Sequence, residues 1–164
     1  MTPIHISLAP MGAARARSSS RTARHYTPQE YRLWLARAAA LAREDLARLA
    51  EDGGDVGGWT PAGGTVCGDA GVQVRIRAVY ERPIAAPVGY TSRQWGSAMC
   101  REREVPRFSK PDVDNIAKAV LDALTGIAWK DDARVWRLSV ERVYARAGDA
   151  ARVEVEVSPW GGAA

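Results

Sequence analysis

The chain has 164 residues, enough for one compact domain with a buried core and too few for two ordinary ones. Hydrophobic residues make up 46% of it, a normal share for a globular protein. No run of about 18 apolar residues predicts a membrane span, and residues 1–7 lack the pattern of a secretory signal. The cysteines, Cys67 and Cys100, have no nearby His or second Cys, so we expect reduced, structural thiols in a cytoplasmic protein.

The net charge of +4 permits an anionic partner but does not require one. Arginine supplies nearly all of the cations, and its planar guanidinium suits phosphate contacts. Only Lys110, Lys118 and Lys130 are lysines. A GC-rich genome produces the same Arg and Ala bias, so the arginines alone identify no ligand.

In chain order, residues 4–8 alternate in polarity and predict a short first strand. Residues 9–24 have no hydrophobic period and no acid, which predicts a flexible basic arm or loop. Its arginines are Arg15, Arg17, Arg21 and Arg24. Thr27 and Pro28 then predict a helix start, with Thr27 as N-cap and Pro28 in the first helical position, and apolar spacing continues the helix to about Ala50.

Two long connections flank the next element. Residues 51–71 are glycine-rich and predict a loop whose length favours disorder. Residues 73–80 alternate in polarity and predict a strand. Residues 83–109 predict a second irregular, basic segment. The cations in and around it are Arg82, Arg93, Arg101, Arg103, Arg107 and Lys110.

The remainder predicts a second helix and two strands. The helix covers residues 114–124, and the strands cover 135–144 and 152–157. Asp112 or Asp114 would cap the helix, and Gly126 would end it. The order strand–helix–strand–helix–strand–strand predicts one α/β (α+β) domain, residues 1–164, with a single mixed β-sheet flanked by two main helices.

Five aspartates crowd the window from residue 110 to residue 132: Asp112, Asp114, Asp122, Asp131 and Asp132. Asp112 and Asp114 are two apart, so an extended entry segment would point both carboxylates the same way. Asp114, Lys118 and Asp122 follow at four-residue spacing and share one helical face. Because the chain turns at Gly126 and returns after a few residues, we expect the last two aspartates to approach the first two.

Converging carboxylates repel one another unless a cation lies among them. Mg²⁺ prefers hard oxygen ligands and would polarise a phosphate and generate a hydroxide nucleophile, while Lys118 would stabilise transition-state charge or position the attacking water. Structural alternatives remain open. In these alternatives, Asp112 would be only an N-cap. The helical face with Asp114, Lys118 and Asp122 would be a solvated row of ion pairs, and the last two aspartates would belong to a turn. The spacing does not fit an EF-hand, and no phosphate-binding glycine motif is present.

The run from Lys110 to Val135, KPDVDNIAKAVLDALTGIAWKDDARV, resembles the signature of the RusA family of Holliday junction resolvases, which is common in bacteria and their phages. That family shows KPD-x-DN-x-x-K, a helix ending in a DAL-like triplet, and a following W/Y-x-DD. A weaker resemblance covers the N-terminal strand, the basic loop and Tyr26-Thr27-Pro28, and the final strands also fit. The chain departs from the family in its long glycine-rich loop and in residues 12–17, where many members are rich in Pro, Lys and Arg.

The resemblance implies a homodimeric, magnesium-dependent endonuclease, with Mn²⁺ as a substitute ion, that resolves Holliday junctions by paired symmetric nicks in DNA recombination and repair. The family's catalytic and metal-binding acids fall on Asp112, Asp114 and Asp132, and its essential lysine falls on Lys118. Asp122 and Asp131 match recurrent positions. A two-fold dimer suits this substrate because two symmetric nicks need two symmetric sites.

Basic residues around the acids would contact DNA phosphates and make binding salt-dependent. The candidates are Arg15, Arg17, Arg21, Arg24, Arg101, Arg103, Arg107 and Lys110. Two other classes of function remain open: a non-catalytic DNA-binding accessory module, and another metal-dependent phosphoryl or nucleotidyl transferase. The complete acid set with Lys118 argues against the first class, and the missing glycine-rich phosphate loop argues against the second.

Overall fold

The computed structural model describes residues 1–14, 17–18, 25–26 and 28–160, and these form an α+β fold on one mixed five-stranded sheet, as predicted. The strand order is β1 (Thr2–Ile6), β7 (Arg152–Pro159), β4 (Val72–Tyr80), β6 (Val135–Tyr144) and β5 (Val105–Pro106). Only β4 and β6 are parallel; the other neighbours are antiparallel. A parallel pair needs a long crossover, and the residues between β4 and β6 supply it.

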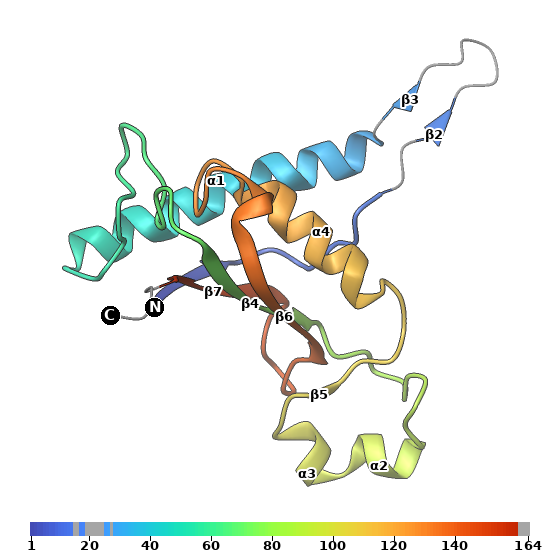
Figure 1. Cartoon of the computed structure of the whole chain (residues 1–164). Helices are drawn as coiled ribbons and strands as arrows, with labels where there is room; N and C mark the ends of the chain where they lie inside the picture. The colour runs from blue at the N-terminus through green and yellow to red at the C-terminus, as the bar shows by residue number, and fades with distance from the viewer. Residues whose placement is uncertain (15–16, 19–24, 27, 161–164) are drawn as a thin grey trace.

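Two helices cover one face of the sheet, and two short ones lie in a separate lobe (Figure 1). The covering helices are α1 (Gln29–Glu51) and α4 (Val113–Leu124). The lobe contains α2 (Ser92–Gly96) and α3 (Ala98–Arg101) beside β5. A short 3-10 helix, η1 (Asp132–Arg134), precedes β6, and β2 (Arg17–Ser18) pairs with β3 (His25–Tyr26) in a second small sheet.

The two faces of β4 differ in chemistry, and this difference produces the alternation of apolar and polar residues that predicted the strand. Its core-facing residues Val72, Val74, Ile76 and Ala78 are fully buried against α1 and α4. The opposite face carries charge: Arg75 pairs with Glu141 at 3.1 Å, and Arg77 pairs with Glu154 at 3.2 Å. One face of the sheet therefore holds the hydrophobic core, while ion pairs line the other.

The first two elements begin at different residues from those predicted. The first strand covers Thr2–Ile6 rather than residues 4–8. Helix α1 begins at Gln29 with Pro28 as its N-cap, so Pro28 is not the first helical residue and the predicted cap at Thr27, which lies outside the described residues, is wrong. Proline has no side-chain acceptor, and the helix starts without a side-chain cap.

The glycine-rich loop is ordered by contacts distant in sequence, so the expectation of disorder is wrong. Trp59, Val66 and Cys67 are buried in the main core. The Val66 and Cys67 N–H groups donate to the carbonyls of Ile127 and Ala128 at 3.1 and 3.0 Å. The loop therefore docks against the turn that follows α4.

The segment 83–109 is also more regular than predicted, because it contains α2, α3 and β5. Thr91 and Gln94 form a reciprocal capping box at the start of α2. Trp95, Cys100 and Tyr144 build a small second core there. Both cysteines of the chain are free and buried. No helix in the described ranges is long and apolar enough to cross a membrane.

The outer edge of β1 depends on Asp45 of α1. Asp45 is buried, pairs with Arg48, and accepts the His5 N–H at 2.7 Å. We expect Asp45→Ala to reduce the free energy of unfolding by about 1–3 kcal/mol, because it leaves a buried donor unsatisfied. Urea unfolding measures this loss. The control is Asp52→Ala at the exposed end of the same helix, which should stay within about 0.5 kcal/mol of the parent; equal losses would contradict the assignment.

Candidate active site

Residues 107–112, here called the strap, connect β5 to α4 and are held by two arginines. Arg107 Nη1 donates to Ser109 O at 2.7 Å, and its Nη2 donates to Lys110 O. Arg142 Nη1 donates to Ser109 O at 3.0 Å and to Pro111 O at 2.6 Å. Three successive carbonyls are thus bound by guanidinium groups, which fixes the backbone leading into α4.

The strap ends in two exposed carboxylates at the start of α4. Asp112 is the N-cap residue, yet its side chain makes no capping hydrogen bond. Its carboxylate is 58% exposed and lies 3.8 Å from Arg142 Nη1. Asp114 follows in the first turn and is exposed. The helix dipole favours negative charge at this end, and both carboxylates stay available for a ligand.

Lys118 lies exposed on α4, one turn after Asp114. Within the described part of the chain it forms no salt bridge, so the structure does not contain the row of ion pairs that was the alternative. Asp122 is instead bound to α1, since Tyr31 Oη donates to it at 2.8 Å. Burial and this bond raise the pKa of Tyr31. The contact gives Asp122 a structural role.

The last two aspartates lie in the turn before β6. Asp131 caps η1 by accepting the Ala133 N–H at 2.9 Å, a bond that lowers its pKa. Asp132 is exposed beside it. Lys130 pairs with Asp69 at 2.7 Å, which anchors the turn to the glycine-rich loop.

One chain does not bring these two groups of acids together. Helix α4 has 12 residues and is therefore about 18 Å long, with Asp112 at its start and the Asp131–Asp132 turn beyond its end (Figure 1). The expected approach of the two groups is wrong within one chain, because the turn after α4 leads into β6 at the far end of the helix. Among the described residues, no group of three His, Cys, Asp or Glu side chains is placed to hold a metal ion.

A hollow of about 800 Å³ opens beside Asp112. Lys110, Pro111 and Asn115 line one side, and the other is lined by Trp34 and by residues 8–13 at the base of the basic arm. The Ala13 N–H donates to Asn115 O at 2.8 Å. The arm thus begins directly against the start of α4.

The proposed DNA-contacting cations differ in availability. Arg101, Arg103 and Lys110 are exposed. Arg107 is engaged in the strap and stacks on Tyr80 at 3.9 Å, so its guanidinium is already occupied. Arg15, Arg21 and Arg24 lie outside the described residues, and only the backbone of Arg17 is described, in β2.

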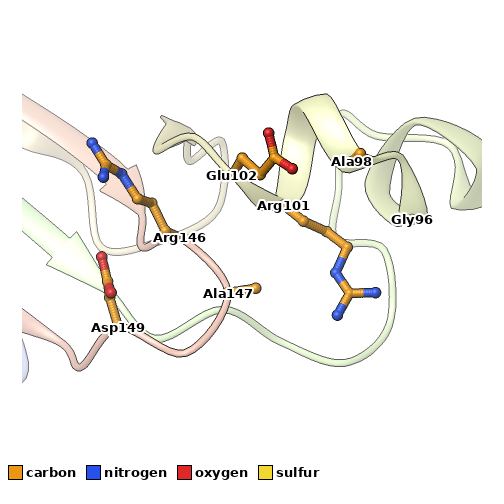
Figure 2. A pocket seen from close by; sticks show the side chains of 7 residues that line it. All are labelled: Gly96, Ala98, Arg101, Glu102, Arg146, Ala147 and Asp149. Carbon is orange, nitrogen blue, oxygen red and sulfur yellow. The ribbon is translucent and has the colours of Figure 1, made fainter.

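A second hollow, of about 580 Å³, lies between the lobe and the β6–β7 turn (Figure 2). Two arginines and two acids line it: Arg101, Arg146, Glu102 and Asp149. Figure 2 shows the guanidinium groups of Arg101 and Arg146 pointing apart. The mixed charge does not favour phosphate, and none of the predicted acids lines this hollow.

Arg142 is the site residue that sequence reasoning missed. It pairs in register with Ala78, whose side chain is in the core, so it lies on the helix-covered side of the sheet. Its neighbours on that face of β6 are Leu138 and Val140. A cation in such an apolar series is the signal that could have marked it, since a charge placed there needs a buried partner.

An α+β domain with exposed paired carboxylates and a nearby lysine at a helix start fits a nuclease. A family model described as endodeoxyribonuclease RusA matches residues 68–158, more than half of the chain. The chain therefore belongs to the RusA family, which implies an endonuclease that resolves Holliday junctions. The match covers β4, β6, β7 up to Ser158, and the five aspartates between residues 110 and 132. No curated protein matches the chain.

We expect Arg142→Met to slow cleavage of a four-way junction about 100-fold, because Pro111 O would lose its donor, Ser109 O would keep only Arg107, and Asp112 would shift. Single-turnover cleavage measures this effect. The control is Arg43→Met, an exposed arginine of α1 outside both the strap contacts and the edge of β6. A near-parental rate in Arg142→Met, or equal slowing in both variants, would show that the strap does not position the acids.

Proposed function

We propose that this protein is a magnesium-dependent homodimeric resolvase, with Mn²⁺ as a substitute ion, that makes paired symmetric nicks in Holliday junctions. It would act in DNA recombination and repair in the cytoplasm. The observation that carries the proposal is the exposed pair Asp112 and Asp114 where the fixed strap enters α4, with Lys118 one turn away, inside the region that matches the family.

The donor set fits such a metal in its chemistry. Asp112, Asp114 and Asp132 are exposed and offer hard oxygen ligands, which Mg²⁺ prefers. One chain presents only the first two at the same end of α4, so we assign the third ligand to Asp132 of a second protomer. Bound there, the ion would polarise the scissile phosphate and lower the pKa of a bound water.

An open strand edge supports the dimer. Strand β5 pairs only with Val143 and Tyr144 of β6, so within the described residues the first part of β6 has no partner on that side. Two large apolar side chains there are exposed, Trp136 to 55% and Leu138 to 41%. An exposed apolar strand edge is a template for pairing with another chain.

The sequence of this edge is self-complementary. An antiparallel two-fold pairing centred on Ser139 would place Arg137 opposite Glu141, and Leu138 opposite Val140, twice each. The same pairing would carry Asp132 of one protomer toward the end of its partner's β6, where Arg142 contacts Asp112. Each half of the dimer would then complete the acid set of the other.

The chain's own cations have separate roles in this proposal. Lys118 would stabilise charge on the phosphate or orient the attacking water. Lys110, Arg101 and Arg103 would hold the backbone of the junction from the exposed surface. Arg15, Arg17, Arg21 and Arg24 would extend this contact, since the base of the arm lies against the start of α4. Arg107 would act through the strap rather than on DNA.

We expect Asp112→Asn, Asp114→Asn and Asp132→Asn each to abolish cleavage and to leave junction binding nearly intact, because cations and not acids hold the phosphates. Cleavage of a synthetic four-way junction with Mg²⁺, beside a gel-shift titration, measures both effects. Full activity in any two of these three variants would contradict the assignment of the three aspartates as metal ligands. A parent protein that binds the junction without cutting it would favour the accessory-module alternative.

Mixing two inactive proteins tests the shared site. Asp112→Asn combined with Asp132→Asn should recover nicking of one strand, because a mixed dimer retains one complete site. The matched control combines Asp112→Asn with Asp114→Asn. That pair should stay inactive, since both losses lie at the same end of α4 and each site of the mixed dimer lacks one of them. No recovery with the first pair would contradict shared sites.

Substitutions of Lys118 distinguish a catalytic role of this lysine from a structural one. We expect Lys118→Met to reduce cleavage by two to three orders of magnitude, about 3–4 kcal/mol of lost transition-state stabilisation. Its melting temperature should barely change, since the side chain is exposed and forms no salt bridge in the described residues. Lys118→Arg should rescue poorly, because a guanidinium lacks the compact ammonium geometry. A normal rate for Lys118→Met would assign this lysine to the scaffold.

A further inference from the structure

Phe108 is the chain's single phenylalanine, and it lies on the strap, four residues before Asp112. Its side chain is 56% exposed. Arg107 and Arg142 bind the strap carbonyls that follow it. The ring therefore projects from a fixed backbone segment that leads into the acid pair.

The ring is supported from one side. It lies 6.0 Å from the ring of Tyr90, centroid to centroid, at 33° between the planes. It also lies directly over Gly89, since a Cβ at that residue would come within 2.4 Å of the ring, and Gly89 has a φ of +92° that favours glycine. Tyr90 is itself fixed, because its hydroxyl donates to Pro106 O at 2.8 Å.

The surroundings match an unpaired nucleobase. Base–aromatic stacking needs one free ring face and tolerates any base, since every base has a π face. Lys110, exposed two residues along the strap, supplies a cation for the adjoining phosphate. Bases inside a duplex are already stacked on both sides, whereas bases at a strand crossing have lost a neighbour. A supported ring on the strap that leads to the acids would therefore favour branched DNA over duplex.

We propose that Phe108 is the structure-selecting residue of this site, stacking on an exposed base at the branch point so that the neighbouring phosphate reaches the acids at the start of α4. The inference rests on the proposed function and deepens it. It gives Gly89 and Tyr90 a role as the platform under the ring.

The test uses a four-way junction with 2-aminopurine at the branch point and the full-length protein carrying Asp114→Asn, which keeps the DNA uncut. Binding should change the 2-aminopurine fluorescence. Adding Phe108→Ala should abolish that change and weaken junction binding by about 5- to 100-fold, with duplex binding unaltered. Phe108→Tyr, which keeps a ring, should behave like the parent. The control is Ile84→Ala, a fully exposed apolar residue that precedes the same lobe and should have no effect.

Three results would overturn the proposal. A parental fluorescence change in Phe108→Ala would show that no base stacks there. Equal losses on junction and duplex would make the residue a general contact. A lowered melting temperature or a dissociated dimer in Phe108→Ala would make the ring structural. The proposed function is judged separately by cleavage with intact Asp114, so it survives if stacking fails while the junction is still cut.

Discussion

The binding of the strap carbonyls by two guanidinium groups is the interaction on which the site depends. Asp112 and Asp114 belong to a helix, but the direction in which that helix starts is set by the residues before it. Arg107 comes from the strap itself and Arg142 from β6, so the strap is fixed both locally and to the sheet. Because Arg142 also approaches Asp112, a single side chain connects the central strands to the acid pair.

Helix α4 and strand β6 form a unit whose two ends carry different halves of the acid set. Helix α4, about 18 Å long, lies between Asp112 and the turn that carries Asp132, so side-chain rotation does not bring the two carboxylates together. In the proposed dimer, the arrangement would become productive when the open edge of β6 pairs with a copy of itself. Under this proposal, catalysis and assembly depend on the same strand, which makes the free monomer an inactive form.

Much of the fold could be predicted because its strands have two chemically distinct faces. The alternation of β4 predicted its bounds to within one residue, and the predicted bounds of β6 are the observed ones. The acid motif identified Asp112, Asp114 and Lys118 as one group. Local patterns could not reveal the docking of Val66 on Ile127 or the contact of Arg142 with the strap, since these join residues far apart in sequence. Residue spacing also does not fix where a chain leaves a turn, so the separation of Asp132 was missed.

The two outer edges of the sheet differ in whether their backbone N–H and C=O groups are occupied, and this difference limits how the protein can assemble. On β1, the carboxylate of Asp45 occupies the His5 N–H that would otherwise face a new strand. On β6, the corresponding groups along the first part of the strand have no strand partner among the described residues. A sheet with two open edges can add chains at both ends and grow into a fibre. With one edge blocked, growth would end after a single pairing, so the proposed strand addition would lead to a closed pair rather than a polymer.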